Sequence, residues 1–231
     1  MPSFPLPPKG SLAGRRKAEF TDRLLSWYRG HGRSFPWRRT GNPYRVWFAE
    51  VLLQRTRSDL VAREYEKIVK VLPDIHNVRN ASLATVRKTI RRLGLPHRAT
   101  YLKRAATYVT TEFEGRFPKE PEKLRSIPGV GDYTANAVAL FAYNKRAFPV
   151  DVNVVRVLDR AFGIKSSKSR PQMDMVYPDF LETAVPKGHE RDFMYGLLDL
   201  ASEICVDNKR TPKCALCPMP DICAWYQQNV R

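Results

Sequence analysis

Four cysteines near the C-terminal end of this 231-residue chain have the spacing of a metal site. They follow the pattern C-x8-C-x2-C-x5-C. In an intracellular chain, clustered thiols favour metal binding over disulfide formation. Four thiolates can hold zinc or a [4Fe–4S] cluster, and the spacing alone leaves both open. The candidate ligands are Cys205, Cys214, Cys217 and Cys223.

Two carboxylates stand in contexts that suit catalysis. Glu50 lies in the middle of residues 44–54, a stretch that is apolar almost all round and therefore predicts a buried helix. A carboxylate in such a helix must be paired or must face a cleft; the alternative is a surface glutamate on a narrow polar stripe. Asp151 precedes another helical stretch, where it can cap the helix and hold its carboxylate in one place.

A turn with two glycines comes shortly before Asp151 and could bind phosphate. Two glycines one residue apart permit backbone conformations that side chains forbid, so the amide groups of the turn can converge on one point. The helix that starts near Asp132 adds partial positive charge there. A lone G-x-G is usually a plain turn, but its place between two helical patterns of a basic chain favours the phosphate hypothesis. The turn consists of Ile127, Pro128, Gly129, Val130 and Gly131.

The charge of the chain points to a polyanionic partner. There are 40 Lys and Arg residues against 23 Asp and Glu, a formal net charge of +17. Such an excess suits nucleic acid more than a membrane surface. No apolar run approaches the ~20 residues needed to span a bilayer, and no secretory signal opens the chain. We therefore expect a cytoplasmic, nucleoid-associated monomer that has no membrane partner.

The elements that must position these residues are all helical, so the sequence predicts an all-α fold. Residues 1–14 contain four prolines and two glycines without apolar periodicity, which predicts a flexible tail. Basic residues flank a tight corner at 93–96 and suit an edge that faces a polyanion, although each alone is an ordinary surface charge. They are Arg87, Lys88, Arg91, Arg92, Arg98, Lys103 and Arg104. Helices are expected from about 15, at 44–54, 58–71, 82–93 and 98–113, from about 132 and about 154, and at 171–184 and 190–204.

Together the motifs resemble the helix-hairpin-helix (HhH-GPD) iron–sulfur DNA glycosylase superfamily, which includes endonuclease III, the MutY adenine glycosylases and the thymine-DNA mismatch glycosylases. The resemblance rests on LRSIPGVGDYT at 124–134, YRVWFAEVLLQRT at 44–56 and the cysteine loop, in the family's order. It implies two helical lobes with a DNA-binding active-site cleft between them. A six-helix lobe at 35–146 would contain the hairpin, and 15–34 with 147–231 would form the iron–sulfur cluster lobe.

The resemblance also assigns roles to single residues. Asp151 falls at the catalytic aspartate, and Glu50 matches a glutamate that helps the base to leave. Gln54 and Arg55 match residues that reach into the opened duplex. Leu95 matches a wedge that props apart the bases beside a flipped nucleotide; the alternative is a leucine tucked into the core.

For the cysteines, the resemblance selects a [4Fe–4S] cluster, because iron–sulfur members of the superfamily end in such a loop. Those members commonly have six residues between the first two cysteines, whereas this chain has eight. The longer loop contains Lys209, Arg210 and Lys213, which could reach a phosphate backbone.

The resemblance implies hydrolysis of an N-glycosidic bond in double-stranded DNA with a mismatched or damaged base. Tyr133 indicates which base: thymine-guanine mismatch glycosylases carry tyrosine at this position, MutY enzymes serine and endonuclease III lysine. We therefore expect a monofunctional enzyme that removes thymine or uracil opposite guanine, in which Tyr133 contacts the flipped nucleotide; the alternative is a half-buried aromatic. Only eight residues follow Cys223, which disfavours the runner-up, a MutY-like adenine glycosylase. From another class, the chain could be a non-catalytic helix-hairpin-helix DNA-binding protein.

Overall fold

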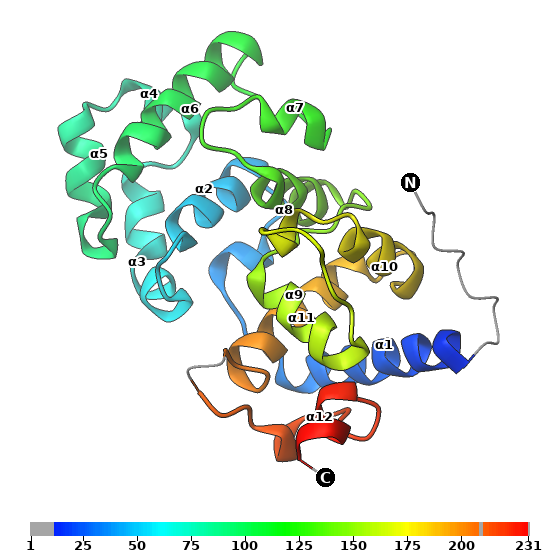
Figure 1. The fold of residues 1–231 in the computed structure, drawn as a ribbon. Helices are drawn as coiled ribbons and strands as arrows, with labels where there is room; N and C mark the ends of the chain where they lie inside the picture. The colour runs from blue at the N-terminus through cyan, green and yellow to red at the C-terminus, as the bar shows by residue number, and fades with distance from the viewer. Residues whose placement is uncertain (1–11, 208–209, 231) are drawn as a thin grey trace. The chain divides into compact units, whose positions relative to one another are not determined.

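The computed structural model describes residues 12–207 and 210–230. Within those ranges every regular element is a helix, which confirms the predicted all-α fold (Figure 1). The chain divides into two compact units. Ser34–Pro149 form one, called here the hairpin unit, and the described residues before and after it form the other, called the cysteine unit. None of the described helices is long and apolar enough to cross a bilayer.

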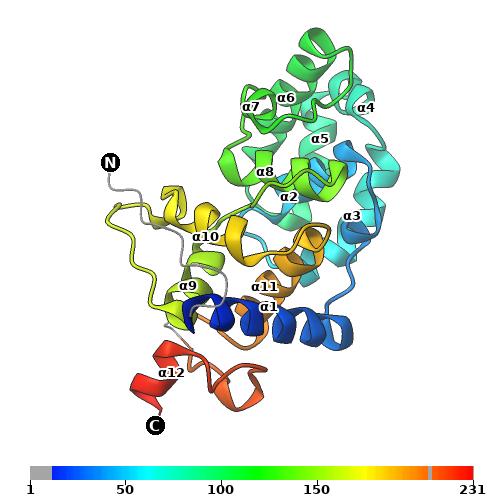
Figure 2. The same ribbon diagram turned by 90° about the vertical axis from the view of Figure 1, so that its right-hand side faces the viewer.

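The hairpin unit is built around α2 (Pro43–Leu53), which packs against α8 (Asp132–Tyr143) in both views (Figures 1 and 2). Asn42 caps α2 by accepting a hydrogen bond from the Arg45 backbone N–H at 3.1 Å. Each large apolar side chain buried on this helix contributes about 1.5–3 kcal/mol to the free energy of unfolding. The buried apolar residues of α2 are Tyr44, Val46, Trp47, Phe48, Ala49, Val51 and Leu52.

Among the other helices of the hairpin unit, α3 and α6 lie where the sequence pattern predicts helices, whereas η1 falls in a segment predicted as a loop. The pattern does not predict α4, whose six residues are too few to show a period and which begins where Asp74 accepts a bond from the Asn77 N–H at 2.8 Å. The helix predicted at 82–93 changes to a 3-10 helix after Ile90. The helices are η1 (Pro36–Arg39), α3 (Ser58–Val71), α4 (Ile75–Asn80), α5 (Leu83–Ile90), η2 (Arg91–Leu93), α6 (Arg98–Glu112) and α7 (Pro121–Arg125).

In the cysteine unit, α1 (Leu12–His31) packs against α11 (Glu190–Glu203). Helix α1 begins three residues before the predicted start, so 12–14 are not part of a tail, and residues 1–11 lie outside the described chain. Asp199 on α11 is fully buried and accepts two bonds from Arg33, from Nε at 2.7 Å and from the backbone N–H at 2.9 Å. This pairing fixes the chain where it leaves α1.

One of the remaining elements of the cysteine unit differs from the helix that the sequence predicts. The single helix predicted at 171–184 is wrong, because Asp174 has extended backbone and its carboxylate accepts a bond from the Ser166 hydroxyl at 2.6 Å. A short polar residue that binds nearby groups in this way competes with the helix. The elements are α9 (Val152–Phe162), η3 (Pro171–Met173), α10 (Val176–Ala184), η4 (Cys214–Leu216) and α12 (Ala224–Asn229).

Candidate active site

The predicted turn joins α7 to α8 as a short hairpin. Leu124, Ile127 and Val130 are buried and anchor the turn to the core of the hairpin unit. The Ile127 N–H donates to the Leu124 carbonyl at 3.1 Å, and the Val130 N–H donates to the Ile127 carbonyl at 3.0 Å. With its apolar side chains turned inward, the hairpin exposes the backbone of its two glycines to solvent.

The two glycines of the hairpin have different roles. Gly129 has a φ of 82°, in the left-handed region that residues with a side chain rarely adopt. Gly131 has a φ of −93° and a ψ of −179°, extended backbone that any residue adopts. The prediction that both glycines are needed for their backbone conformation is therefore wrong for Gly131. A Cβ at this position would have no atom within 4 Å, so the glycine leaves open space at the start of α8.

Asp151 is held by the N-terminus of its own helix. Its Oδ1 accepts bonds from the backbone N–H groups of Asn153 and Val154, both at 2.9 Å, and its Oδ2 accepts one from Asn153 Nδ2 at 2.6 Å. The side chain is half-buried. Three donors thus fix the orientation of a carboxylate that solvent still reaches, so the cap predicted from sequence is compatible with a catalytic role.

Glu50 and Tyr133 both belong to the hairpin unit, on the two helices at its centre. Glu50 is 9 % exposed, among the apolar side chains of α2. The alternative of a surface glutamate on a polar stripe is therefore wrong. Tyr133 lies on the first turn of α8 and is half-buried.

Two turns with left-handed backbone follow α2 and η2. Gln54 and Arg55 come directly after α2 and are exposed, and Arg55 has a φ of 55°. Leu95 has a φ of 50° and follows Gly94, whose φ is 74°. Leu95 is half-buried, so the alternative of a leucine tucked into the core is wrong.

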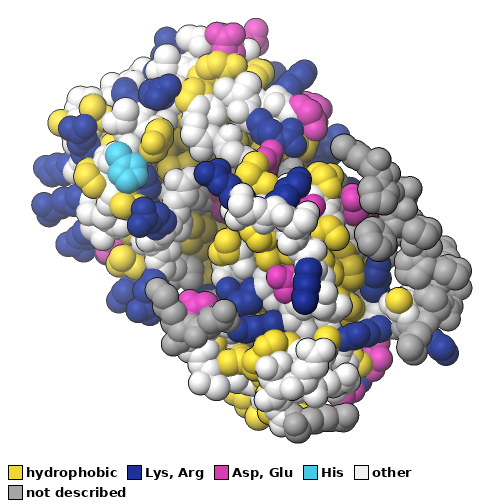
Figure 3. All heavy atoms as spheres, viewed as in Figure 1, with side chains coloured by type: hydrophobic (Ala, Val, Ile, Leu, Met, Phe, Trp, Pro, Cys, Tyr) yellow, Lys and Arg dark blue, Asp and Glu magenta, His cyan; other side chains and the backbone are white. Residues whose placement is uncertain are grey.

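The predicted basic edge is only partly a surface. Arg98 is fully buried, and Lys103 donates to the carbonyls of Arg79 and Ala81 at the end of α4. These two cations therefore serve the hairpin unit itself. The others are exposed, and Figure 3 shows Lys and Arg side chains (dark blue) gathered at its left edge, over α5 and α3. The exposed members are Arg87, Lys88, Arg91, Arg92 and Arg104.

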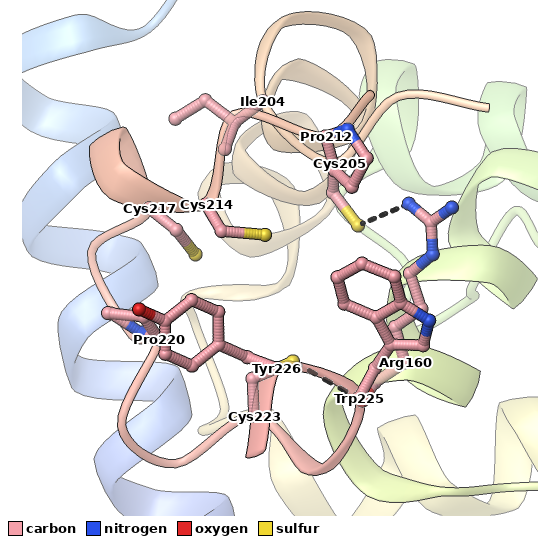
Figure 4. A pocket seen from close by; sticks show the side chains of 10 residues that line it. All are labelled: Arg160, Ile204, Cys205, Pro212, Cys214, Cys217, Pro220, Cys223, Trp225 and Tyr226. Carbon is pink, nitrogen blue, oxygen red and sulfur yellow. Dashed lines mark hydrogen bonds between the residues drawn. The ribbon is translucent and has the colours of Figure 1, made fainter. Parts of the chain in front are cut away.

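All four cysteines line one pocket in the cysteine unit, and their sulfur atoms point into it (Figure 4). The thiols are free. Among the described residues, no group of three or more His, Cys, Asp or Glu side chains is arranged to hold a single metal ion. The rings of Trp225 and Tyr226 line the same pocket as the four thiols.

Arginines from distant parts of the cysteine unit hold the cysteine loop in place. Arg16 on α1 donates from Nε to the Ile222 carbonyl at 2.8 Å, and Arg23 donates to the Asp221 carboxylate at 2.6 Å. Arg160 on α9 donates to Cys205 Sγ at 3.4 Å, and its guanidinium lies 5.2 Å from the centre of the Trp225 ring. Arg160 contacts a cysteine sulfur directly, so positive charge lies beside Cys205.

Three of the four thiols, those of Cys214, Cys217 and Cys223, lie in surroundings that raise their pKa values. Burial raises the pKa of the Cys217 thiol to about 12. Burial, with a further contribution from the neighbouring cysteines, also raises the pKa values of Cys214 and Cys223. Metal binding requires thiolates, so a cation bound here would have to displace the protons of these thiols.

A chain of hydrogen bonds connects Asp151 to the cysteine loop. Asn153, which donates to Asp151, accepts a bond from Arg156 Nη1 at 3.1 Å. Arg156 also donates from Nε to the Cys205 carbonyl at 2.8 Å. The orientation of the carboxylate therefore depends in part on the loop. The sequence pattern does not single out Arg156, since nothing in its neighbours distinguishes it from a surface arginine.

The basic residues of the longer first cysteine loop are described only in part. Lys209 lies outside the described residues. Arg210 and Lys213 are exposed, and Arg210 Nε lies 3.7 Å from an Asp207 carboxylate oxygen.

The chain is similar in sequence and in fold to proteins of known activity. Residues 48–176 match the model of the HhH-GPD superfamily base excision DNA repair proteins. The chain is 38% identical over 225 residues to a thymine-DNA glycosylase of Aeropyrum pernix, covering 96% of this chain and 98% of that protein. It is 37% identical over 218 residues to a thymine/uracil-DNA glycosylase of Pyrobaculum aerophilum, covering 92% and 94%. A solved structure of a thermostable thymine-DNA glycosylase matches with a TM-score of 0.87 at 33% identity, over 94% of this chain and 100% of that one.

Proposed function

Because the chain belongs to the HhH-GPD superfamily of base excision DNA repair proteins, we propose that it is a DNA N-glycosylase that removes thymine or uracil mispaired with guanine. The observation that carries the proposal is the likeness to thymine-DNA glycosylases over nearly the whole chain. The excess of 40 basic over 23 acidic residues supports binding to double-stranded DNA. In this proposal the protein acts as a monomer on the DNA of the nucleoid.

The reaction replaces the bond between the sugar C1′ and the base nitrogen with a bond from C1′ to the oxygen of water. The target nucleotide must first leave the duplex, because its C1′ is out of reach inside the stack. As the bond breaks, its electron pair stays with the base and positive charge develops on the sugar. Asp151 is fixed in orientation by three donors. It stabilises this charge and orients the water that attacks C1′.

Two residues of the hairpin unit act on the nucleotide. Glu50, which is buried, donates a proton or a hydrogen bond to the departing base. Tyr133 packs its ring against the flipped nucleotide and directs its hydroxyl towards it. A phenol cannot form the imine through which bifunctional glycosylases cut the strand, so the enzyme is monofunctional.

The remaining candidate residues bind the duplex. The backbone amides of Pro128, Gly129, Val130 and Gly131 cannot all donate, since proline lacks an N–H and the Val130 N–H is used within the turn. Gly129 and Gly131 are therefore the turn's donors to a phosphate. Gln54, Arg55 and Leu95 enter the opened duplex, while Arg210, Lys213 and Lys209 bind the backbone near the cysteine loop.

We further propose that Cys205, Cys214, Cys217 and Cys223 hold a [4Fe–4S] cluster rather than zinc. All four thiols line one pocket, and the family resemblance favours the cluster over zinc, because iron–sulfur members of the superfamily end in a cysteine loop of this kind. When bound, the cluster supplies a structural cross-link between the ends of the loop. Protein purified without air should contain about four irons per chain, and stoichiometric zinc without iron would contradict this.

A base-release assay tests the proposed function. The substrates are duplexes with thymine or uracil opposite guanine, adenine opposite guanine, and adenine opposite oxidised guanine. We expect release of thymine and uracil only. Release of adenine alone would indicate an adenine glycosylase, and binding of mismatched duplex without release of any base would indicate a non-catalytic DNA-binding protein.

A further inference from the structure

Arg98 is a buried cation that binds only backbone carbonyls. It is the first residue of α6 and is 0 % exposed. Its Nη1 donates to the Leu52 carbonyl at 2.5 Å, and its Nη2 donates to the carbonyls of Leu93 at 2.6 Å and Gly94 at 2.9 Å. Burying a charge costs free energy unless the charged group is hydrogen-bonded, so the folded hairpin unit depends on these bonds to keep Arg98 buried.

The carbonyls that Arg98 binds belong to two separate segments. Leu52 lies in the last turn of α2, where the negative end of the helix dipole favours a cation. Leu93 is the last residue of η2 and Gly94 follows it, so both lie at the corner between η2 and α6. The guanidinium thus ties together the end of α2, this corner and the start of α6.

Each segment leads directly into an exposed or half-buried turn with left-handed backbone. The first turn contains Gln54 and Arg55, and the second contains Leu95. Residues with a side chain keep such backbone only where the surroundings enforce it. Thr56 adds a direct link, because its Oγ1 donates to the Leu93 carbonyl at 3.3 Å. The two turns are therefore held to each other as well as to α6.

We propose that Arg98 is a positioning residue that keeps Gln54, Arg55 and Leu95 at a fixed separation, so that they enter the duplex together when the target base is flipped out. The inference rests on the proposed function. Opening a duplex requires groups that fill the vacated space and hold the separated bases apart. If the two turns moved independently, the protein would open the duplex less efficiently, even though Asp151 and Glu50 were unchanged.

The proposal predicts a dependence on pairing that a general structural role does not. A target base in an unpaired bubble needs no wedge, whereas one in a duplex does. Loss of Arg98 should therefore slow the release of uracil paired with guanine far more than the release of uracil from a bubble. A general loss of structure would slow both equally.

The experiment uses the full chain with Arg98→Met, Arg98→Lys and Thr56→Val, and measures single-turnover uracil release from both substrates. Arg116→Met is the control, since it removes the same charge from an exposed position of the hairpin unit. For Arg98→Met we expect a loss of about tenfold or more on the duplex, because bonds from a charged donor are among the stronger ones. Thr56→Val should also slow release from the duplex, but by a smaller factor than Arg98→Met. The release rate of the Arg116→Met control should stay close to that of the wild type on both substrates. The release rate of every variant from the bubble should also stay close to that of the wild type.

A second readout reports duplex opening without base release. Fluorescence of 2-aminopurine next to the target should rise less on binding of the Arg98 variants than on binding of the wild type. The proposal would be overturned if the Arg98 variants lost the same factor in release rate on duplex and on bubble. It would also be overturned if their binding raised the 2-aminopurine fluorescence as much as wild-type binding does. If Arg98→Met does not fold, as judged by thermal melting, Arg98→Lys and Thr56→Val decide by the same criteria. A wild-type protein that releases uracil from neither substrate would refute the proposed function instead.

Discussion

The hairpin turn at 127–131 and the cysteine loop at 205–223 are both short segments that present groups to a ligand, but they are held in place differently. The hairpin is fixed by buried side chains and by hydrogen bonds between residues three or four apart, as between Val130 and Ile127. The cysteine loop is held by arginines from distant helices: Arg16 and the Ile222 carbonyl that it binds are 206 residues apart. One segment is thus built locally, and the other depends on the folded cysteine unit.

Asp151 belongs with the locally built parts, because its three donors belong to Asn153 and Val154, two and three residues further along the chain. Its environment nevertheless extends through Asn153 and Arg156 to the Cys205 carbonyl. The carboxylate of the proposed chemistry is thus oriented by its own helix, while the loop that would hold the cluster is positioned by distant helices.

The largest expected effect changes the chemistry without disturbing the local structure. Asn caps helices about as well as Asp, so Asp151→Asn should leave the thermal stability and the DNA affinity close to those of the wild type. Loss of the negative charge should slow base release ~100-fold or more, as measured by single-turnover release of uracil opposite guanine. A variant that released uracil at nearly the wild-type rate would show that Asp151 has no catalytic role.

The next effect tests whether the cysteine loop depends on α1. Arg16→Met removes the bonds to the Ile222 carbonyl at 2.8 Å and the Ala161 carbonyl at 2.6 Å. Hydrogen bonds from a charged group contribute about 1.5–3 kcal/mol each, so iron content and thermal stability should both fall. Arg15→Met is the matched control, since Arg15 is the exposed neighbour on the same helix. If the two variants retained equal iron, the loop would be held by the cluster alone.

The contrast between local and long-range contacts also explains which parts of the fold and of the candidate site the sequence predicts. Helix α3 begins and ends where the pattern placed it, and the Asp151 cap was expected, because both follow from neighbouring residues. The four cysteines that line the pocket were likewise identified by their spacing. The sequence pattern places Arg98 on a surface edge, and it does not distinguish Arg16 from other surface arginines. Nothing in the nearby sequence distinguishes a buried arginine bound to distant carbonyls from a solvated one.

A smaller effect distinguishes the two hairpin glycines. Gly129→Ala puts a side chain on left-handed backbone, so it should lower the free energy of unfolding by about 1–2 kcal/mol. Gly131→Ser meets no neighbouring atom and keeps a good cap residue, so stability should change little. DNA affinity should fall for both variants. A Gly131→Ser protein with unchanged affinity for duplex would show that no phosphate comes close to this position.

The last prediction is that no covalent intermediate forms, and it follows from Tyr133. A bifunctional glycosylase attacks the sugar with an amine, and borohydride reduces the resulting imine to a stable protein–DNA adduct. Tyr133 lies on the first turn of α8, and the next lysine in the chain, Lys145, follows the far end of this helix. At 1.5 Å per residue the two positions are about 18 Å apart along the helix axis, much further than a lysine side chain reaches.

We therefore expect no trapped adduct when wild-type protein, duplex with uracil opposite guanine and borohydride are incubated together. The product strand should remain intact and break only after hot alkali. Tyr133→Phe should give the same result, with base release slowed only modestly, because the ring remains and only the hydroxyl is lost. A strong trapped band with the wild type would show that an amine attacks the sugar, and would contradict the proposed monofunctional mechanism.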